Sequence, residues 1–74
     1  MTASEITFMI EYVTKNLISL LMEKYNYSVE TAFDVLYNSE TFQKLTDEKT
    51  GLYFQSPNYI FSFLTNEIES GKIR

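Results

Sequence analysis

Residues 4–25, SEITFMIEYVTKNLISLLMEKY, decide the fold of this 74-residue chain. One side of this stretch carries apolar residues at the three- and four-residue spacings of an α-helix. These residues are Ile6, Met9, Ile10, Val13, Leu17, Leu20 and Leu21. Thr2 and Glu5 have the spacing of a capping box, which marks the start of a helix. The sequence therefore predicts a long N-terminal helix over about residues 4–25, with one face turned to a core.

Two shorter helices are predicted after a turn at residues 26–28. Ser28 is a good N-cap for a second helix, and Glu30 lies in its first turn, where a carboxylate interacts favourably with the helix dipole. Asn38-Ser39 interrupts this helix, and either residue can cap a short third one. The residues expected on the inner faces of the two helices are Val29, Ala32, Phe33, Leu36, Phe42 and Leu45.

The rest of the chain predicts a loop and a fourth helix. Residues 46–51 are polar and end in glycine, which indicates a loop or turn. Leu52-Tyr53-Phe54 has the composition of a short extended piece, although one such piece cannot form a sheet alone. Ser56-Pro57 begins a helix over about residues 57–69, and Gly71 ends it. Its inner face is expected to hold Ile60, Phe61, Leu64 and Ile68.

These patterns predict an all-α fold, a small bundle of three to four helices with a long N-terminal helix. Residues 1–74 are expected to form a single helical domain, because the chain has no linker, internal repeat or low-complexity segment. Hydrophobic residues make up 45% of the chain and aromatic residues 16%, a composition that excludes a disordered protein. A domain of this size buries only roughly 60% of its unfolded surface, so we expect modest stability.

Cysteine and histidine are both absent from the sequence. The chain therefore lacks disulfides, thiol and imidazole catalysis, and the usual ligands of zinc, copper and haem. Its two glycines are too far apart for a phosphate-binding loop, and its carboxylates are not spaced to act on a common substrate. We predict a non-enzymatic protein with no catalytic, cofactor-binding or metal-binding residues.

Acidic residues outnumber basic ones ten to six, for a net charge of −4. This balance opposes a dedicated binder of nucleic acid or of anionic membranes. The densest apolar run, residues 17–22, is much shorter than a membrane-spanning helix. Glu5 and Glu11 lie where a signal peptide would be basic and then apolar. We expect a soluble, cytoplasmic protein.

The apolar residues outside the core stripes are the most informative feature of the sequence. The first predicted helix carries a second apolar band on its opposite side, and two aromatic residues flank the inner face of the fourth helix. The six residues are Phe8, Tyr12, Ile18, Met22, Tyr59 and Phe63. Either the shorter helices wrap the first one and cover this band, or the band faces another protein. Our leading hypothesis is a protein-protein interaction module that forms a homodimer through these six residues.

An alternative comes from residues 30–45, which have the outline of a helix-turn-helix. Phe33 lies where a small residue usually lets the two helices cross, and Tyr37 replaces the usual glycine of the turn. The second helix and the loop after it carry three acidic residues against two lysines, so they bring no net positive charge to phosphates. A DNA-binding regulatory domain that uses these two helices is the second hypothesis, and nucleic acid is less favoured than protein as the partner.

A longer pattern covers about residues 5–69. It consists of the initial apolar helix, then Tyr27-Ser28-Val29-Glu30-x-Ala32-Phe33-x-Val35-Leu36, then Thr50-Gly51-Leu52-Tyr53-x-x-Ser56-Pro57-x-Tyr59-Ile60, and a closing Asn66-Glu67-Ile68. This pattern resembles short bacterial helical domains of unknown function that often accompany ADP-ribosyltransferase-like proteins in gene neighbourhoods. The resemblance implies a bacterial origin and a partner-binding or antitoxin-like role, and it assigns no functional residue.

Overall fold

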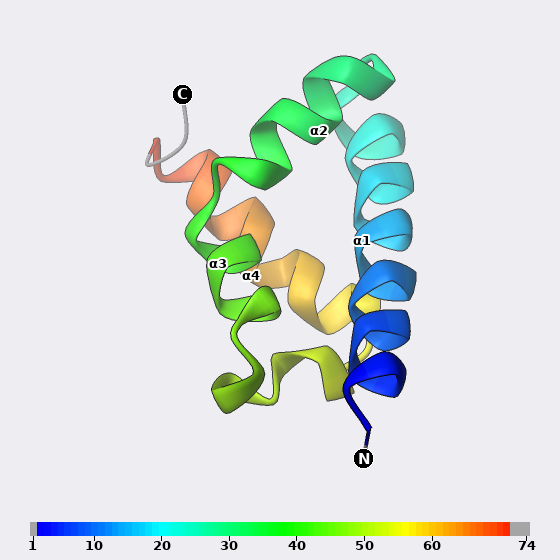
Figure 1. Cartoon of the computed structure of the whole chain (residues 1–74). Helices are drawn as coiled ribbons and strands as arrows, with labels where there is room; N and C mark the ends of the chain where they lie inside the picture. Colours follow the sequence, from blue (N-terminus) through cyan, green and yellow to red (C-terminus); the bar gives the residue numbers. More distant parts are fainter. Residues whose placement is uncertain (1, 72–74) are drawn as a thin grey trace.

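A computed structural model describes residues 2–71 of the chain, and it is all-α within them. Its elements are α1 (Ala3–Tyr25), α2 (Val29–Tyr37), α3 (Glu40–Thr46), the 3₁₀ turns η1 (Glu48–Thr50) and η2 (Leu52–Phe54), and α4 (Pro57–Glu69) (Figure 1). The predicted bundle with a long N-terminal helix is confirmed.

The predicted capping box begins α1. The backbone N–H of Thr2 donates to the Glu5 carboxylate at 2.9 Å, and the backbone N–H of Glu5 donates to the Thr2 hydroxyl at 3.2 Å. These bonds satisfy N–H groups that have no partner within a helix. The Glu5 carboxylate accepts hydrogen bonds from the N–H and the hydroxyl of Thr2, and these two bonds lower the pKa of the Glu5 carboxyl. Asn26 ends α1 in the left-handed conformation, with φ at 58°. The helix begins one residue earlier than predicted and ends where predicted.

A serine caps each of the three shorter helices. The hydroxyls of Ser28, Ser39 and Ser56 accept the backbone N–H three residues further on, at 3.2, 3.0 and 3.2 Å. Each bond satisfies one of the free N–H groups in the first turn of its helix. The predicted start and end of α4, with Pro57 at its first position, are confirmed.

The prediction of an extended piece at residues 52–54 is wrong, because these residues form the turn η2. Gly51 adopts a φ of 64°, which reverses the chain between η1 and η2. The backbone N–H of Phe54 then donates to the carbonyl of Gly51, and that of Gln55 to Leu52. With no neighbouring strand to pair with, the three residues satisfy their backbone locally, and Tyr53 packs into the core.

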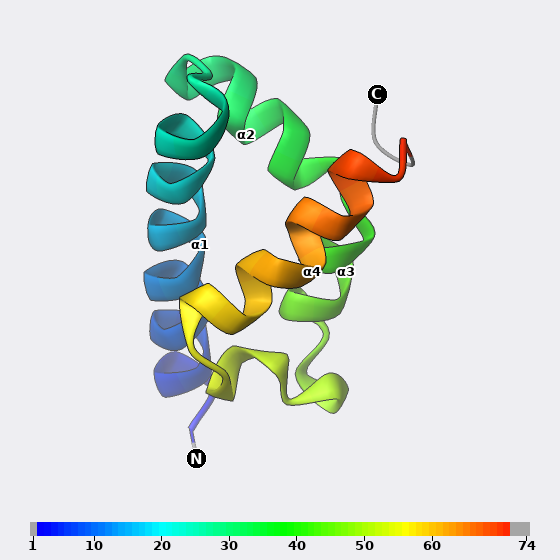
Figure 2. The ribbon, with the colours of Figure 1, turned by 180° about the vertical axis from the view of Figure 1, so that it is seen from behind.

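The helix α1 forms one side of the molecule, and α2 folds back from its C-terminal end (Figure 1). Seen from behind, α4 crosses from the lower half of α1 toward α3 (Figure 2). The core lies between these elements and is made mostly of aliphatic side chains. It contains Ile6, Val13, Leu17, Ile18, Leu21, Ala32, Leu36, Leu45, Tyr53, Ile60 and Leu64.

Within residues 2–71, no helix is both long enough and apolar enough to cross a membrane.

A hydrogen bond joins the C-terminal ends of α1 and α4. The Tyr25 hydroxyl donates to the Glu69 carboxylate at 3.0 Å, and Lys24 lies 4.0 Å from the same carboxylate. Partial burial and this hydrogen bond, which favours the protonated phenol, raise the pKa of Tyr25 to about 12. The contact links two helices that are 44 residues apart in the sequence.

We predict that the Tyr25 hydroxyl ionises at a higher pH than an ordinary phenol. Because its pKa in the folded state is raised above the usual 10.0, the neutral form adds stability below about pH 10. This contribution is lost as the pH rises from 10 to about 12. In an ultraviolet titration of tyrosinate, Tyr25→Phe should remove absorbance that develops near pH 12, and Glu69→Ala should move it to lower pH. Glu11→Ala, a change elsewhere on α1, should leave the curve in place; an unchanged curve in Glu69→Ala would contradict the prediction.

Candidate interaction surface

The molecule buries aliphatic side chains and exposes aromatic ones. Among residues 2–71, nine large hydrophobic side chains are 38–69% exposed, and seven of the nine are aromatic. Tyr53 is the one aromatic residue in the buried set of the same range. Aromatic side chains carry much contact area and are enriched in protein interfaces. The nine exposed residues are Phe8, Tyr12, Met22, Val29, Phe33, Tyr37, Phe54, Tyr59 and Phe63.

The structure corrects the predicted position of Ile18. Its side chain is 7% exposed and belongs to the same core cluster as Ala32 and Leu36 of α2. The reason is geometric: Ile18 lies on the flank of α1 that α2 covers, between the core stripe and the free face. The other five predicted residues are exposed, and they lie in three separate places.

Phe8 and Tyr12 lie on the N-terminal half of α1, next to η2. They line a hollow of about 330 Å³ together with Phe54, a residue that the sequence analysis did not select. These three side chains are 69%, 55% and 58% exposed, and we call them the N-terminal patch. No charged side chain lines this hollow, because its other lining residues are apolar or neutral polar. The patch can therefore be covered by another uncharged surface without burying a charge.

Met22 lies on a second hollow, the α1–α2 groove, of about 560 Å³. The sequence analysis placed two residues on the α2 side of this groove, Val29 and Phe33, in the core. Ala32 and Leu36 are buried as predicted, but Val29 and Phe33 are 47% and 38% exposed. The predicted inner face of α2 was displaced around the helix, because the buried residues of α2 are Ala32, Val35 and Leu36.

Tyr37 extends the exposed side of α2 by one more turn. Val29, Phe33 and Tyr37 are spaced four residues apart, so they form one stripe along the helix. Phe33 packs edge-on against Tyr37 at 5.4 Å between ring centroids, and Tyr37 contacts Phe42 of α3 at 4.8 Å. The four-residue spacing was present in the sequence, and it could have indicated this stripe.

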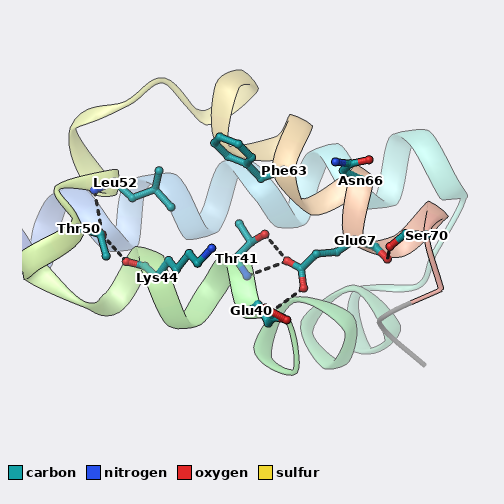
Figure 3. A pocket seen from close by; sticks show the side chains of 9 residues that line it. All are labelled: Glu40, Thr41, Lys44, Thr50, Leu52, Phe63, Asn66, Glu67 and Ser70. Atoms are coloured by element: carbon teal, nitrogen blue, oxygen red, sulfur yellow. Dashed lines mark hydrogen bonds between the residues drawn. The ribbon is translucent and has the colours of Figure 1, made fainter.

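Tyr59 and Phe63 lie on the flank of α4 that faces α3. Their rings pack edge-on at 5.0 Å, and Phe63 lines a third hollow, of about 380 Å³, with Leu52 and Lys44 (Figure 3). The N-terminal patch lines a different hollow. The single surface predicted for α1 and α4 is therefore divided, because α4 turns this flank toward α3 and η2.

A carboxylate of α4 caps the N-terminus of α3 at the edge of the third hollow (Figure 3). Glu67 accepts the backbone N–H of Glu40 at 2.9 Å and that of Thr41 at 2.7 Å. The buried hydroxyl of Thr41 also donates to Glu67. Both carboxylate oxygens are thus used to hold α3 on α4.

We predict that Glu67 stabilises the fold. Glu67→Ala leaves two N–H groups and a buried hydroxyl without their acceptor, so the free energy of unfolding should fall by about 2 kcal/mol. Glu67→Gln keeps one acceptor oxygen and should cost less. The measurement is urea unfolding followed by circular dichroism. Glu23→Ala, which removes an exposed carboxylate of α1, is the matched control. Equal losses in Glu67→Ala and the control would contradict the proposed role.

No group of three or more Asp or Glu side chains suited to a metal ion is found within residues 2–71. The Glu67 carboxylate, which lines the third hollow, is engaged by α3. The hollows instead offer exposed aromatic and aliphatic surface, which can bind another protein by burial.

Comparison with protein-family models, with curated proteins and with solved structures finds no match to this chain. The resemblance to the bacterial helical domains stays a prediction.

Proposed function

We propose that this chain is a non-enzymatic protein-interaction module that self-associates through the N-terminal patch. The observation that supports the proposal is the separation of side chains by type, with aliphatic residues inside and seven aromatic residues exposed. Phe8 is the most exposed of the nine large hydrophobic residues, and Tyr12 and Phe54 lie on the same hollow. Exposed apolar surface of this kind marks interaction sites on small domains.

A second copy of the chain is a chemically suitable occupant of the N-terminal patch. A two-fold dimer places the same surface on both subunits, so any charge in it would face an identical charge. The hollow beside Phe8 and Tyr12 has no charged lining residue, so this repulsion is limited to Glu5, which lines a neighbouring hollow with Phe8. A small domain with modest stability also gains from burying its remaining apolar surface in an oligomer.

The available area limits how tight this dimer can be. An aromatic side chain has roughly 150–250 Å² of surface, and the three residues are 69%, 55% and 58% exposed, so two copies together offer on the order of 700 Å². This is about half of the ~1,600 Å² that a standard interface buries. The neighbouring residues of α1 and η2 must supply the rest. We therefore expect a dimer in exchange with monomers, with a population that depends on concentration.

The predicted dimer is tested by light scattering after size exclusion, over about a hundredfold range of concentration. The wild-type mass should rise toward twice the monomer mass. Phe8→Glu and Tyr12→Glu should keep the chain monomeric, because each variant would bury a carboxylate in the interface with the second copy. Circular dichroism should show that the helicity is unchanged.

Tyr59→Glu is the matched control for this experiment. It places the same charge on an exposed aromatic residue of α4, outside the N-terminal patch, and should leave the dimer intact. A monomeric wild type at every concentration would exclude self-association. Loss of the dimer in Tyr59→Glu alone would instead place the interface on α4.

The DNA-binding alternative has less support. In a helix-turn-helix formed by α2 and α3, the N-terminal end of α3 would approach the DNA. Here the first N–H groups of α3 bind the Glu67 carboxylate, and this negative charge lies at the end that phosphates would approach. The cytoplasmic location, bacterial origin and antitoxin-like role expected from the sequence remain predictions.

A further inference from the structure

We propose that the α1–α2 groove binds an amphipathic helix of another protein, with basic residues along the edges of its apolar face. This site is distinct from the N-terminal patch, and its occupant is a different chain. The inference rests on the shape of the groove, on its apolar lining and on the charges around it.

The groove has the length of a short helix. Its α1 side extends from Ile10 to Met22, which corresponds to about 18 Å at a rise of 1.5 Å per residue. Its α2 side is the stripe of Val29, Phe33 and Tyr37, which spans about two turns. A partner helix of about three turns therefore fits between the two helices.

The lining offers places for individual side chains. Thr14 and Ser19 of α1 are small, so they leave room between the larger walls. Ile18 forms part of the floor, and Phe42 of α3 closes one end beside Tyr37. A helix that places apolar residues at positions i, i+4 and i+7 can insert them here, which is the usual mode of helix-in-groove recognition.

The charges around the groove determine the kind of partner. Glu30 and Asp34 are exposed on α2, each three residues before an aromatic residue of the stripe. Glu11 lines the α1 side, and Lys15, one turn further along, is the one basic residue in the lining. Glu11 and Lys15 line the groove itself, and Glu30 and Asp34 lie beside the aromatic stripe of α2, so three carboxylates and one ammonium group surround the groove. Lysine or arginine beside the apolar face of the partner helix complements this charge.

The same charges disfavour two other occupants. A second copy in a two-fold arrangement would bring Glu30 and Asp34 near their own counterparts. An anionic membrane surface would also meet this acidic edge and be repelled. A basic helix from a different protein satisfies both the apolar lining and the acidic edges.

The test uses a panel of fluorescent helical peptides of about 14 residues, with apolar residues at positions i, i+4 and i+7. In one half of the panel the flanking positions are Lys or Arg, and in the other half they are Glu. Binding to the full chain is followed by fluorescence anisotropy. We expect some of the basic peptides to bind, at least about tenfold more tightly than their acidic counterparts and more weakly as salt is raised.

Three variants locate the binding site. Phe33→Ala should weaken binding of the best basic peptide by about tenfold or more. Glu30→Lys combined with Asp34→Lys should reverse the preference in favour of acidic peptides. Both changes are at exposed positions, so the fold should survive, as circular dichroism will show. Phe63→Ala, which shortens an exposed aromatic residue of α4, is the matched control and should not change the affinity.

The proposal fails if no basic peptide binds better than its acidic counterpart, or if Phe33→Ala binds as the wild type does. It also fails if Phe33→Ala lowers the solution mass of the chain, since the groove would then hold a second copy. These results are independent of the proposed dimer: Phe8→Glu should abolish self-association and leave peptide binding unchanged, because Phe8 does not line the groove.

Discussion

Burial of one aliphatic stripe on a 23-residue helix is the constraint on which the rest of this structure depends. Val13, Leu17 and Leu21 of α1 are almost completely buried, and they must be covered along most of the length of the helix. The elements available are α2, with nine residues, and α4, with 13, together with the short turn η2. These elements approach α1 from one side. The opposite face of α1 is left uncovered, because α3, the remaining helix within residues 2–71, packs against α2 and α4 instead.

The choice of side chains in the core explains why several separate surfaces remain. Leucine, isoleucine and valine fill the interior, so the larger aromatic rings occupy the outer edges of the helices. The hollow beside η2 and the α1–α2 groove therefore each have several aromatic lining residues. The N-terminal patch and the α1–α2 groove differ mainly in the charges around them. That difference supports the proposal of a second copy of the chain at the N-terminal patch and of a basic helix at the α1–α2 groove.

The extent to which the sequence predicted the structure differs between local and tertiary features. The helices and their caps follow from local rules, so Thr2, Ser28 and Ser56 identified the start of three helices correctly. The errors concern residues whose environment depends on distant elements. Ile18 was assigned to the free face because its position on α1 is borderline, and only the path of α2 decides that it is buried. Phe33 was assigned to the core for the same reason, and the capping of α3 by Glu67 has no local signal because the partners are 26 and 27 residues apart.

The Glu67 carboxylate also has a consequence for the order in which the chain folds. A seven-residue helix such as α3 is too short to be stable alone in water, because nucleation of a helix is costly. The N–H groups of Glu40 and Thr41 find their acceptor only when α4 is present, so the stability of α3 depends on α4. During synthesis, α1 and α2 leave the ribosome before this partner exists. Local opening of α4 would therefore remove the acceptor of α3 as well, so the stabilities of the two helices are linked.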